Sequence, residues 1–212
     1  MPSSPDAIER TPVAVTTVLL VRHCLHDLGP SKLAGRLPSI ALSDKGRAQA
    51  ERLADRVERE GIAELHSSPQ QRTLETAAPI AERCGVKVEI VQALDEVDFG
   101  EWAGQSFQEL EADPRWVAWN SEREYALTPA GEKISGLAKR VIRHIEHCCE
   151  AGAVARIAMV THAEVIRTAV LHCLGMPFSA FGRIEVAPAS ISKIVFANDG
   201  PVLTGLNETV VV

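Results

Sequence analysis

The chain alternates short, almost purely apolar runs with longer segments of helical periodicity. Two apolar runs stand out, at residues 17–21 and 154–160. Runs of this kind are typical of central parallel strands that are covered on both faces. Shorter strand patterns occur at residues 64–67 and 87–91, and closing strands are expected over 182–204. Together these segments predict the strands of one sheet.

Between the predicted strands, apolar residues recur at helical spacing. The periodicity predicts helices over residues 42–60, 68–81, 131–149 and 163–173. In the second of these helices, Ser68 has the position of an N-cap and Pro69 that of the first helical residue. Residues 101–130 are mixed in character, and Pro114 interrupts any long helix there, which predicts a small helical excursion over the sheet. The order of the elements predicts an α/β fold, a three-layer sandwich in which helices flank a mostly parallel central sheet.

Composition and charge limit the class of protein. With 212 residues, 46% hydrophobic and 24% charged, the chain can form one globular domain with a full core, which we expect over residues 16–212. Residues 1–15 include several Pro and Ser residues and predict a disordered tail instead of a signal peptide. The net charge of -6 and the pI near 5.7 argue against a nucleic-acid or membrane-surface partner. No stretch is long enough to span a bilayer.

The cysteines and the outlying histidines predict no metal centre. The five cysteines form an odd, scattered set without a C-x-x-C pair, which suits a reducing cytoplasm. His144 and His147 are three residues apart, but they lie off the apolar stripe of their predicted helix, so we expect them to be solvated. His66 and His172 are expected to be packing or surface residues. No metal and no cofactor are therefore expected.

Three predicted strand-to-helix junctions carry cationic or imidazole side chains. Arg22 and His23 end the first strand, Arg72 lies in the first turn of the helix after the second, and His162 follows the strand at 154–160. Because the carboxyl ends of parallel strands meet at one edge of a sheet, we expect these groups to gather there. Helix N-termini add free backbone N–H groups and the positive end of a dipole. This combination suits phosphate, although a solvated strand end can also carry an Arg-His dipeptide.

Motifs along the chain resemble those of the histidine phosphatase superfamily, which includes cofactor-dependent phosphoglycerate mutases and many small phosphatases. They are Leu20-Val21-Arg22-His23, Ser67-Ser68-Pro69-Gln70-Gln71-Arg72-Thr73, Leu94-Asp95-Glu96-Val97-Asp98-Phe99-Gly100-Glu101-Trp102-Ala103-Gly104, Pro129-Ala130-Gly131-Glu132 and Val160-Thr161-His162. The resemblance runs from about residue 18 to residue 167. It implies a phosphoglycerate mutase-like fold and, in the small phosphatase branch, metal-independent hydrolysis of phosphomonoesters.

The resemblance also implies roles for single residues. His23 would attack phosphorus and carry a phosphohistidine, and Glu96 would protonate the leaving group and then activate water. The residues expected to bind the phosphate or the substrate are Arg22, Arg72, His162, His26, Arg36 and Ala163. The first three of these would also stabilise charge in the transition state. Rival acids in the same acidic segment are Asp95, Asp98 and Glu101.

Several positions depart from the family pattern. Cys24 stands where the family commonly has Gly or Ala, and His26 replaces the usual Thr or Ser. After His162, Ala163 and Glu164 stand where the family usually has two glycines. Thr161 and Glu164 have the spacing of a helix capping box. If the Glu164 carboxylate points inward, it is expected to lower the affinity for phosphate.

Two alternatives to a phosphatase stay open. One is phosphoglycerate mutase-type phosphoryl transfer, which the short chain and the altered first motif disfavour. The other is a non-catalytic phospholigand-binding homologue that keeps the pocket but has lost turnover. For the enzyme, the expected partner is a phosphorylated small molecule whose identity depends on loops that the sequence does not place. A homodimer is left open.

Overall fold

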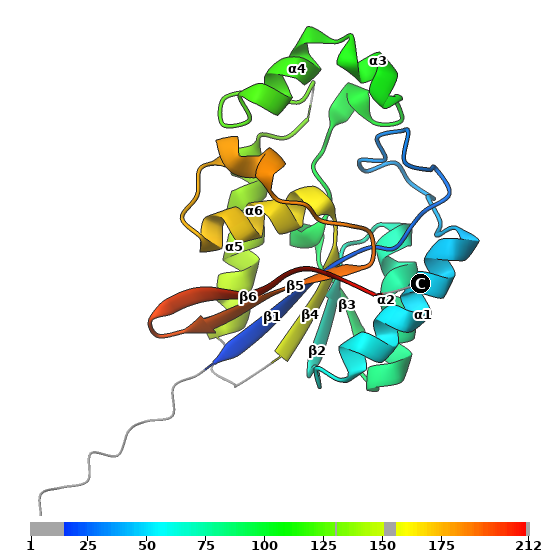
Figure 1. Ribbon diagram of the computed structural model, residues 1–212, viewed down its shortest axis with the longest axis vertical. Coiled ribbons are helices and arrows are strands. Elements are labelled where there is room, and N and C mark those ends of the chain that lie inside the picture. The colour runs from blue at the N-terminus through cyan, green and yellow to red at the C-terminus, as the bar shows by residue number, and fades with distance from the viewer. Residues whose placement is uncertain (1–14, 130, 151–155, 211–212) are drawn as a thin grey trace, which may run out of the picture.

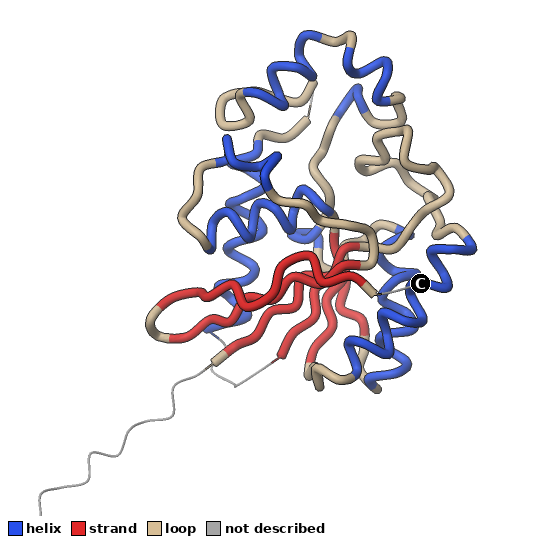
Figure 2. Tube along the Cα trace, in the orientation of Figure 1, coloured by secondary structure: helices blue, strands red, loops and turns tan. Residues whose placement is uncertain are grey.

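The strands form one sheet with a parallel centre. The structure is a computed structural model that describes residues 15–129, 131–150 and 156–210, so the tail expected at 1–15 lies outside it except for Val15. The strands in the described ranges are β1 (Thr16–Arg22), β2 (Glu64–Ser67), β3 (Val88–Ile90), β4 (Arg156–Thr161), β5 (Ser190–Ala197) and β6 (Gly200–Thr209). Their order is β3-β2-β4-β1-β5-β6 (Figures 1 and 2). The first four are parallel, β5 is antiparallel to β1, and β6 is antiparallel to β5.

Helices cover both faces of this sheet. α1 (Asp44–Glu58) and α2 (Gln71–Cys84) lie on one face, and α5 (Ile134–Glu150) and α6 (Ala163–Cys173) lie on the other (Figure 1). The shorter elements are α3 (Phe107–Glu111), α4 (Pro114–Ser121) and the 3-10 helices Gln92–Leu94, Gly100–Trp102 and Phe178–Arg183. The predicted three-layer α/β sandwich is thereby confirmed. Within the described ranges, no helix combines the length and the apolar character needed to cross a membrane.

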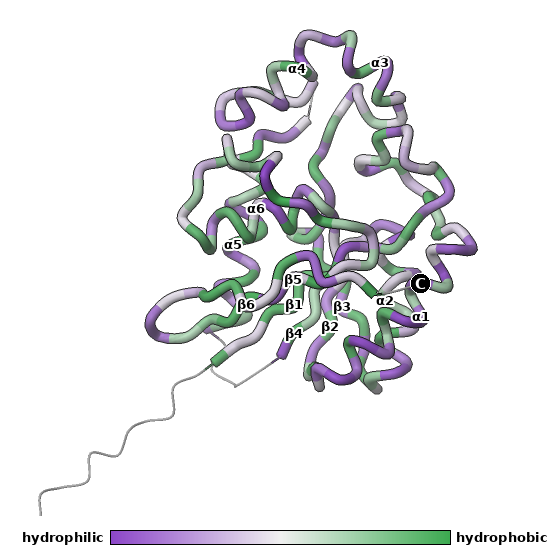
Figure 3. Tube along the Cα trace, in the orientation of Figure 1, coloured by the Kyte–Doolittle hydropathy of each residue, from purple (hydrophilic) through white to green (hydrophobic). Residues whose placement is uncertain are grey.

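The layers on both faces explain the uninterrupted apolar run in β1. Val18 and Leu20 pack into the core cluster on the side of α5 and α6, whereas Leu19 and Val21 pack into the cluster on the side of α1 and α2. All four side chains are fully buried, and burial of each contributes about 1.5–3 kcal/mol. Figure 3 shows hydrophobic residues in the central strands and many hydrophilic residues along α1. The strand that leads into the site is therefore held from both sides.

Two predicted helix caps are wrong. α2 begins two residues after Pro69 and has no side-chain N-cap. The capping box expected from Thr161 and Glu164 is not formed at the start of α6. The Thr161 hydroxyl instead donates to the carbonyl oxygen of Leu94, at 2.6 Å. The Ser68 hydroxyl likewise bonds to distant side chains, which are described below. In both places, partners far along the chain outcompete the local cap.

The helices α3 and α4 belong to an excursion that projects from the rest of the fold (Figure 1). Its two ends meet at Asp98, whose carbonyl oxygen accepts from the Thr128 hydroxyl at 2.7 Å and from the Glu132 N–H at 2.9 Å. Glycine is required at position 131, because a Cβ atom on Gly131 would lie 2.1 Å from the same carbonyl oxygen. Pro114 is the first residue of α4, a position that proline favours. The excursion is thus closed at its base.

Candidate active site

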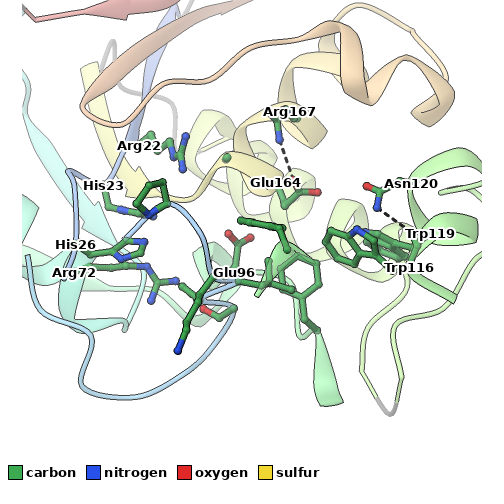
Figure 4. A pocket seen from close by; sticks show the side chains of 18 of the residues that line it. Arg22, His23, His26, Arg72, Glu96, Trp116, Trp119, Asn120, Glu164 and Arg167 are labelled. Atoms are coloured by element: carbon green, nitrogen blue, oxygen red, sulfur yellow. Dashed lines mark hydrogen bonds and ion pairs between the residues drawn. The ribbon is translucent and has the colours of Figure 1, made fainter. Parts of the chain in front are cut away.

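The carboxyl ends of β1 and β4 lead into a cavity of about 340 Å³. Its walls include six of the predicted site residues: Arg22, His23, His26, Arg72, Glu96 and Ala163. Figure 4 shows Arg22, His23, His26 and Arg72 on one side of the cavity and Trp116 and Trp119 on the other, with Glu96 between them. A cavity of this volume suits a small organic molecule.

His23 is buried at the cavity in the form that a nucleophile needs. Its Nδ1 lies 2.8 Å from the carbonyl oxygen of Cys24, so Nδ1 carries the proton and Nε2 keeps its lone pair. Burial, and then the charges of Arg72 and Arg22, lower the pKa of His23 well below its usual value. The ring is therefore neutral at pH 7, with Nε2 available for attack.

Two arginines present N–H donors without an acceptor among the described residues. Arg72 is almost fully buried; its Nη2 donates to the carbonyl oxygen of Gly35 at 2.7 Å, whereas its Nε and Nη1 are unpaired. In Arg22, Nη1 donates to the carbonyl oxygen of Val186 and Nε is unpaired. Buried donors are rarely left without partners, because an unsatisfied buried polar group is costly. A phosphoryl group offers the acceptors that these guanidinium groups lack.

His162 lies behind His23 in a hydrogen-bond chain that the sequence did not predict. Its Nδ1 accepts from Arg72 Nη2 at 3.1 Å, so its Nε2 carries the proton and donates to Ser68 Oγ at 2.8 Å. Ser68 Oγ in turn donates to Asp95 Oδ1 at 3.2 Å. The ring centroids of His162 and His23 are 5.3 Å apart. The chain therefore orients both His162 and Arg72 beside the buried imidazole.

Glu96 is the carboxyl group of the acidic segment that faces the cavity. Burial and, next, the negative charge of Glu164 raise the pKa of Glu96 to about 7, so much of it is protonated at neutral pH. The rival acids point elsewhere. Asp95 and Asp98 accept backbone N–H groups at 2.8 and 3.0 Å, and Glu101 pairs with Arg115 at an exposed position.

Arg36 is placed outside the cavity wall, where it supports the backbone at Glu96 instead of making the expected contact with a substrate anion. Its Nε donates to the carbonyl oxygen of Glu96 at 2.7 Å, and its Nη2 pairs with Glu132 at 3.1 Å. Arg140 donates to the same Glu96 carbonyl at 3.0 Å and to that of Asp95 at 2.7 Å, and it also pairs with Glu132. Nothing in the helical pattern of α5 signals Arg140. The two arginines and Glu132 thus hold the backbone that carries Glu96.

Glu164 lines the cavity, but its carboxylate is paired with two arginines. It forms ion pairs with Arg123, which follows α4, and with Arg167, one turn further along α6. The Arg123 guanidinium also lies over the rings of Trp119 and Phe181, 5.3 and 4.3 Å from their centroids. These cations offset the repulsion that Glu164 was expected to exert on phosphate, and they join the excursion to α6.

Of the residues that depart from the family pattern, one is buried in the core and the others line the cavity. Cys24 is fully buried in the core cluster on the side of α1 and α2, and burial raises the pKa of its thiol to about 12, so it is no competing nucleophile. His26 lines the cavity with its ring centroid 5.4 Å from that of His23, and burial lowers its pKa to about 4. Ala163, the first residue of α6, brings the N-terminal backbone of that helix to the cavity wall.

Comparisons with known proteins agree on one family. The model of the histidine phosphatase superfamily (branch 1) matches residues 18–209. Phosphoserine phosphatase 1 of Hydrogenobacter thermophilus is 29% identical over 197 residues, which cover 91% of this chain and 92% of that protein. A probable phosphoglycerate mutase GpmB of Erwinia tasmaniensis is 29% identical over 181 residues, or 84% of this chain and 83% of that protein. Among solved structures, a mutant phosphoserine phosphatase of Entamoeba histolytica in complex with phosphoserine has a TM-score of 0.82 and 26% identity, with coverage of 91% of this chain and 96% of that one.

Proposed function

Because the chain belongs to the histidine phosphatase superfamily, we propose that it is a metal-independent phosphomonoester phosphatase that forms a phosphohistidine on His23. The observation that carries the proposal is the pair of arginines Arg22 and Arg72, each of which has a buried N–H donor that finds no acceptor among the described residues, beside a neutral imidazole. Together these groups supply the nucleophile and the charge stabilisation that phosphoryl transfer needs.

In the first step, the phosphoryl group binds to the two guanidinium groups and Nε2 of His23 attacks phosphorus. The P–N bond forms while the bond to the ester oxygen breaks, and Glu96 gives its proton to the departing oxygen. The Nδ1–H bond to the Cys24 carbonyl stabilises the positive charge that develops on the ring. An alcohol leaves, and a phosphohistidine and the Glu96 carboxylate remain.

In the second step, the Glu96 carboxylate takes a proton from water, and the water oxygen attacks phosphorus. The P–N bond breaks, inorganic phosphate is released, and Nε2 of His23 recovers its lone pair. One group must act as an acid in the first step and as a base in the second. A pKa of about 7 suits both tasks at neutral pH.

The cavity supports a small phosphorylated molecule as the substrate class. Beyond the phosphate side, its wall is formed by the indoles of Trp116 and Trp119 with Asn120 beside them (Figure 4). A leaving group with both an apolar surface and a polar group fits such a wall. The Entamoeba relative was solved with phosphoserine, which is a small phosphorylated molecule.

Phosphate release from a panel of small phosphomonoesters, measured with EDTA present, tests the proposed function. We expect turnover of at least one ester, unchanged by EDTA. Isomerised phosphoglycerate without free phosphate would instead identify a mutase. Phosphate binding with no turnover of any ester would identify a non-catalytic homologue. Either result contradicts the proposal.

The pH profile of the phosphatase is expected to depend on Glu96. The first step needs the protonated carboxyl, so kcat/KM should fall as pH rises through about 7. In Glu96→Gln the side chain is neutral at every pH, so this alkaline limb should disappear while kcat falls by about 10²- to 10⁴-fold. The measurement is kcat/KM against pH for both proteins with the best ester of the panel.

Glu101→Gln is the matched control for that experiment. Glu101 comes from the same acidic segment, but its carboxylate is exposed and paired with Arg115. We expect this variant to keep both the rate and the alkaline limb. If Glu96→Gln keeps the limb as well, another group is the general acid.

A further inference from the structure

Three side chains that the proposed phosphatase chemistry does not use meet between the sheet and α5. Nδ1 of His66, in β2, lies 3.1 Å from Nε2 of His144, and Cys148 Sγ lies 4.0 and 3.7 Å from these two nitrogens. His66 is almost fully buried, and His144, which was expected to be solvated, is half-buried beside it. None of the three lines the active-site cavity.

The three atoms have the spacing of ligands around one metal ion. Bond lengths of about 2.05 Å to imidazole nitrogen and about 2.3 Å to thiolate sulfur place tetrahedral ligands about 3.3 Å apart for two nitrogens and about 3.6 Å apart for nitrogen and sulfur. The observed separations are 3.1 Å, and 3.7 and 4.0 Å. His144 and Cys148 are four residues apart on one helix, so they project from the same face. Only a small side-chain adjustment is needed to place an ion between them.

The other nitrogen of His66 faces carboxylates. Its Nε2 lies 3.4 Å from Glu64 Oε2 and 3.6 Å from Glu89 Oε2. A carboxylate at the remote nitrogen of an imidazole fixes the tautomer and raises the basicity of the nitrogen that binds a metal. The two carboxylates also supply negative charge next to the position where the cation would lie. The cluster therefore has both the ligands and the supporting groups of a metal site.

We propose that His66, His144 and Cys148 bind a zinc ion that connects α5 to β2. Two imidazoles and a thiolate are a donor set that Zn²⁺ favours over Mg²⁺ or Ca²⁺, which prefer oxygen. His144 and Cys148 are half-buried, so the cluster is in reach of solvent, from which water could serve as the fourth ligand. The ion would connect a helix on one face of the sheet to a strand near the sheet edge. Its role is structural and separate from the proposed phosphoryl transfer.

Titration of the untagged, chelator-treated full chain with Zn²⁺ and with Co²⁺, under a non-thiol reductant, tests the proposal. We expect one ion per chain by calorimetry and a cobalt spectrum with a thiolate charge-transfer band. Zinc at about 100 times its Kd should raise Tm by roughly 5–10 °C. Cys148→Ser should remove the charge-transfer band, and His144→Gln should weaken zinc binding at least about tenfold.

Neighbouring residues of α5 provide matched controls. Cys149→Ser and His147→Gln change the same residue types outside the cluster and should keep the affinity, the cobalt spectrum and the rise in Tm. Circular dichroism and ester turnover of each variant show that it has folded. The proposal is overturned if the wild-type chain binds no zinc, or if folded Cys148→Ser and His144→Gln bind it as the wild type does.

Discussion

Replacement of His23 by alanine is expected to lower kcat by about 10⁴-fold or more, because the imidazole that would attack phosphorus and carry the phosphoryl group is lost. Cys24 is a buried thiol with its pKa raised to about 12, and the Nδ1 atom of His162 is occupied by Arg72. The wild-type enzyme, quenched in alkali during turnover of p-nitrophenyl phosphate, should carry one phosphoryl group on Nε2 of His23. The variant should carry none.

His172→Ala is the control for the loss of His23, because His172 is exposed in the last turn of α6. It should retain the wild-type rate and the phosphoenzyme. Inorganic phosphate should still bind to folded His23→Ala, since both arginines are kept. A phosphoenzyme in His23→Ala, or turnover close to that of the wild type, would assign the nucleophile to another residue.

Replacement of Arg72 is expected to have the second largest effect. Its Nε and Nη1 donors, unpaired among the described residues, are the groups that would contact the phosphoryl oxygens. Loss of one such donor costs roughly 10²- to 10³-fold in kcat. Arg72→Lys keeps the charge but loses the planar fork, so we expect kcat to fall by about that factor. The affinity for inorganic phosphate should fall as well.

Arg83→Lys tests whether that effect belongs to the site. Arg83 is on the same helix as Arg72, but it lies in the last turn and pairs with Asp55 on α1. This variant should match the wild type in kcat and in phosphate affinity. If folded Arg72→Lys also matches the wild type in both, the guanidinium geometry is irrelevant to the reaction.

The parts of the site that lie at strand ends could be predicted from the sequence. The apolar run of β1 is buried on both faces, so Arg22, its last residue, and His23, the residue after it, had to emerge at the edge of the sheet. The parallel pairing of β1 with β4 brings His162 to the same edge. These conclusions need only the hydrophobic pattern and the direction of the strands.

The supporting residues could not be predicted in the same way, because their partners are far along the chain. Ser68 bonds to His162 across 94 positions, and Arg140 reaches the Glu96 carbonyl across 44. Glu164 was expected to cap its own helix, but Arg123, 41 positions away, takes its carboxylate. A short stretch of sequence contains the donor or the acceptor but not its distant partner. Judged from that stretch alone, the side chain is therefore assigned to the nearest helix cap.

The helical pattern also misplaced His144. Taken alone, α5 has one apolar stripe, and a histidine outside that stripe is expected to face water. In the fold, the flank of α5 that carries His144 and Cys148 lies against His66 of β2. The sheet beneath α5 is wide enough to cover this flank as well as the apolar stripe. The width of the sheet is a property of the whole fold, so the pattern of one helix does not predict it.

The base of the excursion separates the segment that surrounds the departing alcohol from the residues that hold Glu96. The choice of substrate and the transfer of the proton can therefore change independently. Both ends of the excursion are tied to Asp98, while Arg36 and Arg140 hold the backbone of Glu96, the proposed proton donor, from the other side. Changes of length or sequence in α3 and α4 therefore leave the backbone of Glu96 in place, provided that Arg123 still pairs with Glu164 and residues 104–107 keep their hydrogen bonds to residues 31–33. A chain built in this way can acquire new substrates through changes in α3 and α4 and keep the same phosphoryl-transfer chemistry.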